Sequence, residues 1–273
     1  MSTLSTSFGR RAVAGVLSAV LSLHAAWAHG DEATDAQVAD RLAAEERECG
    51  SFYREGRNPP SDYRTAPRRI GGKLSLVENR HFTPGVRTLT RHSTGPFGDD
   101  LDYTLYSFPN HLPALLVMDE LAQREKTDKP AGALHTIDCY YRRAIRYASD
   151  DMLARVAYAD YLRRSNRADD ALKQLNFALE NAGDNGFTYF NIGLAYMGLK
   201  AYDQALVAAH RAIANGFDRP DLKKQLSALN RWRDPDPAST AAAPASAAST
   251  AAVAASGSAL VAPPGMPPSA PGR

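Results

Sequence analysis

The second half of the chain carries a pattern of apolar and polar positions that repeats with a period of about 34 residues. Apolar residues three and four positions apart predict four helices, over 151–164, 168–180, 187–198 and 202–215. Small residues recur at equivalent places in the two copies, and so do large apolar ones: Ala159 as Gly193, Leu162 as Tyr196, Ala171 as Ala205, Leu172 as Leu206, and Ala178 as Ala212. Such a repeat predicts stacked helical hairpins, with small residues where two antiparallel helices approach closely.

Residues that favour helix starts stand just before two of these segments. Ser149 and Asp150 can cap the first helix, because their side-chain oxygens accept hydrogen bonds from free backbone N–H groups. Asp184 or Asn185 can do the same for the third helix.

Within the second copy, the sequence 189–196, followed by 202–206 and Ala212, resembles the consensus of the tetratricopeptide repeat family. Residues 152–185 and 186–219 are the two copies, and the first matches the consensus less closely. The resemblance implies an all-α solenoid of short helical hairpins, as in uncharacterised secreted bacterial proteins of this family. Both copies lack the proline usual near the repeat end, so the turn between hairpins departs from the consensus.

The pattern extends beyond these two copies in both directions. One period earlier, residues 111–149 predict a degenerate hairpin with helices over 111–124 and 134–147. After the repeats, residues 220–233 predict a capping helix, introduced by Asp218 and polar on its outer side.

The region before the hairpins, residues 29–110, is predicted to be a mostly irregular extension. Prolines among many polar residues between positions 50 and 72 argue against regular elements there. Short helices are expected over 36–48 and from about residue 84 to residue 91.

Both ends of the chain differ in composition from the part expected to fold. Residues 1–28 have the layout of a secretory signal, with Arg10 and Arg11 before an apolar run and expected cleavage after Ala28. A transmembrane anchor is the alternative, but the apolar run is interrupted and shorter than the roughly 20 residues a span needs. Residues 234–273, rich in Ala, Pro and Ser, predict a disordered tail that is either inert or a spacer. We therefore expect a periplasmic or secreted protein with no stable membrane span after cleavage.

Charge and cysteine content narrow the classes of partner and compartment. The chain has 32 Lys and Arg against 30 Asp and Glu, a formal charge of +2, so nucleic acid is not an expected partner. Cys49 and Cys139 favour a disulfide in an oxidising compartment, with two separately buried thiols as the alternative. The disulfide would tie the N-terminal extension to the hairpins.

The resemblance also implies which side chains line a protein-binding groove. By the offsets of the family these are Val156, Asp160, Arg163 and Arg164 in the first copy, and Phe190, Leu194 and Met197 in the second. They would form an apolar floor with one basic wall, suited to an extended or helical peptide with apolar anchors. The N-terminal extension or the capping helix filling the groove is the alternative.

A group of metal-capable residues precedes the hairpins: His81, His92, Asp99, Asp100, Asp102 and His111. Their spacing matches no helical metal motif, and no nucleophile or phosphate-binding motif is found, so we expect neither a metal nor another cofactor.

The leading hypothesis is a non-enzymatic adaptor or scaffold of the bacterial cell envelope that binds another protein or peptide. The alternatives are a metal-binding protein or metal-dependent enzyme using residues 81–111, and a self-associating structural protein.

Overall fold

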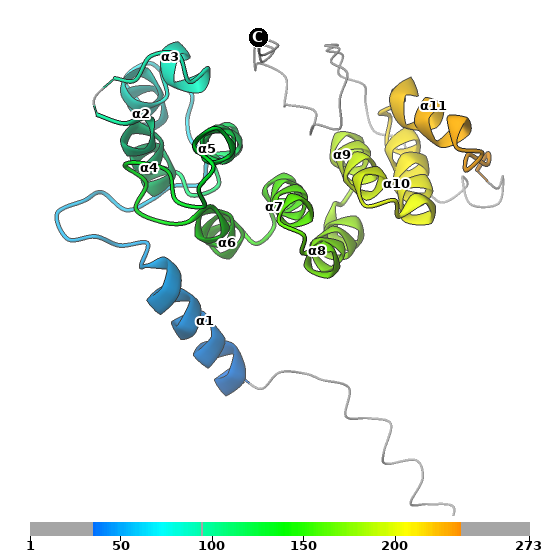
Figure 1. The fold of residues 1–273 in the computed structure, drawn as a ribbon, viewed down its shortest axis with the longest axis horizontal. Helices are drawn as coiled ribbons and strands as arrows, with labels where there is room; N and C mark the ends of the chain where they lie inside the picture. Colours follow the sequence, from blue (N-terminus) through cyan, green and yellow to red (C-terminus); the bar gives the residue numbers. More distant parts are fainter. Residues whose placement is uncertain (1–34, 94, 236–273) are drawn as a thin grey trace, which may run out of the picture. The chain divides into compact units, whose positions relative to one another are not determined.

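The computed structural model describes residues 35–93 and 95–235, and in these ranges it contains eleven helices and no strand (Figure 1). The chain divides after Arg47 into two units. The first unit contributes most of helix α1 (Asp35–Cys49), which agrees with the helix expected over 36–48. The signal-like segment 1–28 and nearly all of the predicted tail lie outside the described residues.

The second unit contains an array of paired helices. The helices of this array are α5 (Leu112–Glu125), α6 (Ile137–Tyr147), α7 (Met152–Arg164), α8 (Ala168–Asn181), α9 (Gly186–Gly198), α10 (Tyr202–Ala214) and α11 (Pro220–Ala228). Consecutive helices contact each other, and α5 also contacts α7, α7 contacts α9, and α9 contacts α11. Helices α5, α7 and α9 therefore form one layer and α6, α8 and α10 the other (Figure 1). The predicted fold class, an all-α solenoid of helical hairpins, is confirmed.

The recurrent small residues lie where the helices are closest. Ala171 and Ala205 are fully buried, as the hairpin pattern requires. A Cβ atom on Gly193 would lie 2.6 Å from Leu222 Cδ1, so the missing side chain leaves room for α11 to pack on α9. Between these contacts Leu162 is completely buried and fills the space.

Two helix starts were predicted from capping residues, and the structure supports one of them. Asp151 caps α7, and its Oδ1 accepts a 3.1 Å hydrogen bond from the Ala154 N–H. The assignment of this role to Ser149 and Asp150 was wrong, because the Asp150 carboxylate accepts from Arg64 instead. Asn185 caps α9 as expected.

The prediction of a mostly irregular segment before the hairpins was wrong for much of its length. Residues 73–107 contain two helices that were not predicted, α2 (Lys73–His81) and α4 (Phe97–Ser107). Between them, α3 (Pro84–Arg87) begins where a short helix was expected and ends before residue 91. Helix α4 packs against both α2 and α5 and so joins this region to the hairpin array. The irregular part of the second unit before α5 is concentrated in residues 50–72.

A disulfide holds this irregular segment to the hairpins. Cys49 and Cys139 are bonded and buried, with their Cα atoms 5.1 Å apart, which confirms the predicted pair. The buried guanidinium of Arg143 donates to the carbonyl oxygens of Cys49, Gly50 and Ser51 at 2.7–3.1 Å. Because the chain-entropy stabilisation grows with loop length, closing this loop of 90 residues contributes on the order of 4 kcal/mol.

Candidate functional site

The structure separates the seven predicted groove residues into two groups. Val156 and Phe190 are 0% and 2% exposed, so they are core residues and do not line an open groove. Helices α7 and α9 contact each other, and both residues belong to the main core, where Phe190 packs on Phe217 with ring centroids 5.2 Å apart. The remaining five stay at least partly exposed on α7 and α9: Asp160, Arg163, Arg164, Leu194 and Met197. We call these five residues the α7/α9 face.

The basic side chains of this face are neutralised by acidic ones. Arg163 donates to Asp160 at 2.8 Å, and Arg164 donates to the other oxygen of Asp160 at 3.1 Å. Arg164 also forms a bidentate pair with Asp119 on α5, whose carboxylate is almost fully buried. The expected basic wall is therefore a charge-balanced network, and it does not select an acidic ligand by net charge.

A buried tyrosine extends this network into the core. The Tyr141 hydroxyl donates to Asp119 Oδ2 at 3.0 Å, and Tyr141 is fully buried. Burial, followed by the charge of Asp119, raises the pKa of Tyr141 well above its ordinary value, so its hydroxyl keeps its proton and remains a donor. Asp119 thus connects α5, α6 and α7 through one carboxylate.

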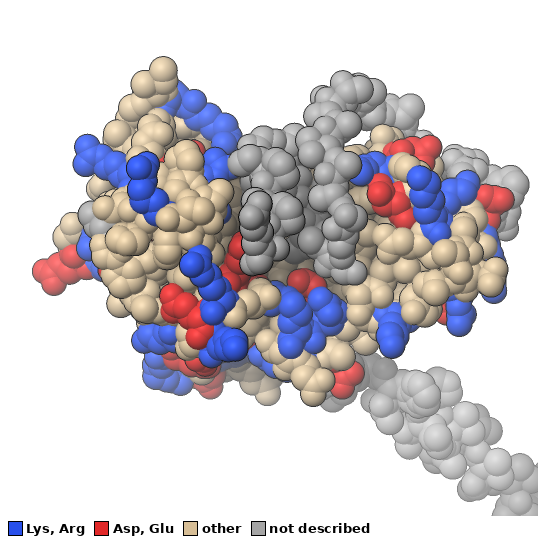
Figure 2. Space-filling view, turned by 45° about the horizontal axis from the view of Figure 1, so that its top comes forward, with Lys and Arg blue, Asp and Glu red and all other residues tan. Residues whose placement is uncertain are grey.

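The apolar side chains of the face lie on α9. Leu194 and Met197 are partly buried against the core and partly exposed. A Cβ atom on Gly198 would lie 3.1 Å from Arg163 Nε, so the absence of a side chain there lets Arg163 lie across α9. On the side of the molecule shown in Figure 2, basic and acidic residues are likewise interspersed over the described part of the chain.

The metal-capable residues between positions 81 and 111 are engaged in separate contacts. His81 Nδ1 lies 3.0 Å from Asp100 Oδ1, and the second Asp100 oxygen accepts from the Ser93 N–H at 2.9 Å. His92 packs edge-on against Phe97. Within the described ranges, the one group of three or more potential ligands close enough for a metal contains Glu48, Cys49 and Cys139, and its cysteines are bonded to each other. The structure therefore does not bring the His and Asp residues together as a ligand set.

His111 has a structural position at the start of α5. Its Nδ1 accepts the Ala114 N–H at 3.1 Å, so the Nε2–H is left to donate to Glu78 Oε1 at 3.2 Å. Burial lowers the pKa of His111, while the hydrogen bond from His111 lowers the pKa of Glu78. These shifts keep the imidazole neutral and the carboxylate ionised at neutral pH, so the pair fixes α5 against α2.

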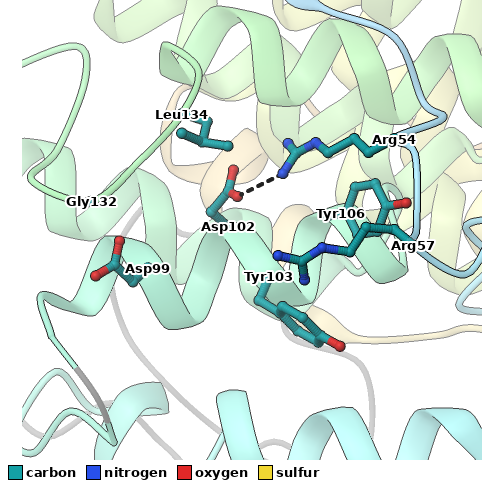
Figure 3. Close-up of a pocket in the computed structure, with 8 residues that line it drawn as sticks. All are labelled: Arg54, Arg57, Asp99, Asp102, Tyr103, Tyr106, Gly132 and Leu134. Carbon is teal, nitrogen blue, oxygen red and sulfur yellow. Dashed lines mark ion pairs between the residues drawn. The ribbon is translucent and has the colours of Figure 1, made fainter.

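A pocket of about 210 Å³ lies beside α4 and was not foreseen from the sequence (Figure 3). Its lining comes from three distant segments: Arg54 and Arg57; Asp99, Asp102, Tyr103 and Tyr106; and Gly132 and Leu134. The α4 residues recur on one side of that helix at spacings of three and four, a pattern that is visible once residues 97–107 are assigned as helical.

Comparison with family models, with curated proteins and with solved structures found no match for this chain. Across residues 35–93 and 95–235, no helix combines the length and the apolar character needed to cross a membrane.

Proposed function

We propose that this protein is an exported member of the tetratricopeptide repeat family that serves as an adaptor or scaffold in the bacterial cell envelope. The observation that carries the proposal is the α7/α9 face, where Leu194 and Met197 remain accessible beside a charge-balanced network on stacked helical hairpins. The protein acts by binding another protein or peptide and not by catalysis.

Export is supported by two independent features. The segment 1–28 has the layout of a secretory signal. The Cys49–Cys139 disulfide is of a kind that persists in the periplasm or outside the cell and is rare in a reducing cytosol.

The chemistry of the face defines the segment that it recognises. Because Arg163 and Arg164 are already paired with Asp160 and Asp119, an acidic partner gains little from them. Partner binding instead depends on apolar side chains packing against Leu194 and Met197, as when an extended or helical segment lies in a groove. Arg163 of the polar network lies beside Gly198, one position after Met197, and so borders this contact.

The test compares charged substitutions on two layers of the array. Leu194→Asp and Met197→Asp place a carboxylate on the α7/α9 face, whereas Val207→Asp places one on α10, where Val207 is 44% exposed. All three variants are purified, checked for native helicity and melting temperature, and used with the wild type to capture envelope proteins. The proposal requires one protein that wild type and Val207→Asp retain and that both face variants lose.

Two outcomes contradict the proposal. Retention of every captured protein by Leu194→Asp and Met197→Asp places binding elsewhere on the chain. A concentration-dependent dimer in light scattering, abolished by the same two variants, assigns the face to self-association instead.

A further inference from the structure

The pocket beside α4 lies in an excess of positive charge. Arg143 is 3% exposed, yet its guanidinium donates to carbonyl oxygens and forms no ion pair with any residue that the structure describes. Burial and the charges of Arg146 and Arg54 lower its pKa to about 10. Burial and the charges of Arg143, Arg54 and Lys129 likewise lower the pKa of His135, next to the pocket residue Leu134, to about 4. Burial is the larger cause of both shifts, and the neighbouring positive charges add to it.

Two arginines at the pocket are held in place by aromatic rings. The guanidinium of Arg54 lies 4.6 Å from the centre of the Tyr106 ring, and that of Arg57 lies 5.4 Å from the centre of the Tyr103 ring. Stacking of this kind leaves the N–H edge of a guanidinium free to donate.

Neither arginine is fully used by the protein. Arg54 lies 3.6 Å from Asp102 Oδ2, longer than a direct hydrogen bond, while Asp102 Oδ1 accepts from Tyr140 at 2.6 Å. The Arg57 side chain lines the pocket. It has no carboxylate partner within the described part of the chain, and its donors therefore lack a counter-ion.

The opposite end of the pocket carries an acidic group. Figure 3 shows Asp99 beside Gly132, on the far side of Asp102 from Arg57. A Cβ atom on Gly132 would lie 2.7 Å from Asp99 Oδ1, so the glycine leaves room for the carboxylate. Asp99 is exposed, and the structure pairs it with no cation among the residues it describes. The pocket is therefore bipolar, basic at one end and acidic at the other.

We propose that this pocket binds a small zwitterion, an amino acid or dipeptide with a free carboxylate and a free amine. The carboxylate pairs with the N–H edge of Arg57, because the planar fork of a guanidinium matches two carboxylate oxygens. The amine lies at Asp99. A volume of about 210 Å³ suits a ligand of this size, and the two aspartates disfavour a multiply charged anion such as phosphate. The site shares no residue with the α7/α9 face, so it goes beyond the adaptor function and does not depend on it.

The test is a calorimetric titration of the full exported protein with the standard amino acids and with alanyl-alanine. Alanyl-alanine amide and N-acetyl-alanyl-alanine remove one charge each, and inorganic phosphate serves as the anion control. We expect saturable binding of the free dipeptide or of an amino acid, weakened at least about tenfold when the carboxylate is amidated. Arg57→Ala should weaken binding of the free ligand by a similar factor and leave the residual affinity for the amide unchanged. Asp99→Asn should weaken binding of the free dipeptide, because the amine loses its carboxylate partner. Binding of N-acetyl-alanyl-alanine should stay unchanged.

Arg80→Ala is the matched control, since Arg80 is exposed on α2 and does not line the pocket. Arg57 and Asp99 are both exposed, so the Arg57→Ala and Asp99→Asn variants should melt at the wild-type temperature. No saturable binding of any of these zwitterions at millimolar concentration overturns the proposal. So does an equal loss with Arg80→Ala, or binding of phosphate more tightly than the zwitterions.

Discussion

Substitution of Asp119 by alanine probes the network that connects three helices of the array. The carboxylate accepts from Tyr141 on α6 and from both terminal nitrogens of Arg164 on α7. Asp119→Ala removes these bonds together while leaving every apolar contact of Tyr141 in place. The change therefore isolates the polar part of the packing.

The size of the effect follows from burial. Tyr141 is fully buried, so its hydroxyl would lose its partner without access to water, at a cost of about 1–3 kcal/mol. The Arg164 side chain is 28% exposed and keeps its pair with Asp160, so the loss of its pair with Asp119 adds about 1 kcal/mol or less. We expect Asp119→Ala to lower the free energy of unfolding by about 3 kcal/mol.

Urea unfolding followed by circular dichroism measures this difference at neutral pH. Asp160→Ala is the control, because Asp160 is part-exposed and its loss should cost about 1 kcal/mol or less. In a Tyr141→Phe background the cost of Asp119→Ala should fall by about 1–2 kcal/mol, since no hydroxyl is then left without an acceptor. A cost below about 1 kcal/mol, or one unchanged by Tyr141→Phe, would show that the buried hydroxyl does not depend on Asp119.

Three further predictions test other parts of the fold. Cys49→Ser with Cys139→Ser should lower the free energy of unfolding by about 4 kcal/mol in non-reducing buffer, and equal stability would show that loop closure contributes nothing. Gly98→Ala should destabilise by about 1–3 kcal/mol, because its Cβ would lie 2.2 Å from the Ala131 carbonyl oxygen; an unchanged melting temperature would contradict this packing of α4. His135 binds a proton less readily when folded, with a pKa of about 4 against 6.5, so stability should fall as the pH drops from about 6.5 towards 4. Because the ring is part-exposed, His135→Leu should reduce that fall by only about 1 kcal/mol, and identical pH profiles would exclude the effect.

The hairpins were predictable because one signal was repeated. The constant period of the repeat reinforced the helical spacing of apolar residues, and each predicted helix from α5 to α10 was found with small shifts at its ends. The cap of α7 was missed, since the choice between Asp150 and Asp151 depends on Arg64, which lies far earlier in the chain.

Helix α4 was missed for a different physical reason. Its buried side mixes Leu101 and Leu105 with Asp100, Asp102 and Thr104, so polar residues interrupt the apolar stripe that marks a helix in sequence. The carboxylates are tolerated there because groups from other segments satisfy them, as Tyr140 does for Asp102. The pocket was missed with the helix, because three separate segments contribute its lining.

The groove was only partly predictable from the resemblance. Offsets along α7 and α9 located Leu194 and Met197 on an accessible face, but the same offsets included Val156, which is fully buried. The pairing of Arg164 with Asp119 was also hidden, because Asp119 belongs to the degenerate hairpin, whose register the consensus does not define.

The most direct test of the adaptor function is site-specific photo-crosslinking in living cells. A photoreactive amino acid replaces Leu194 on the α7/α9 face and, in a parallel strain, Val207 on α10. We expect a discrete crosslinked product with a different protein from position 194 and none from position 207. The absence of any product at position 194, or a product containing only a second copy of this chain, would contradict it.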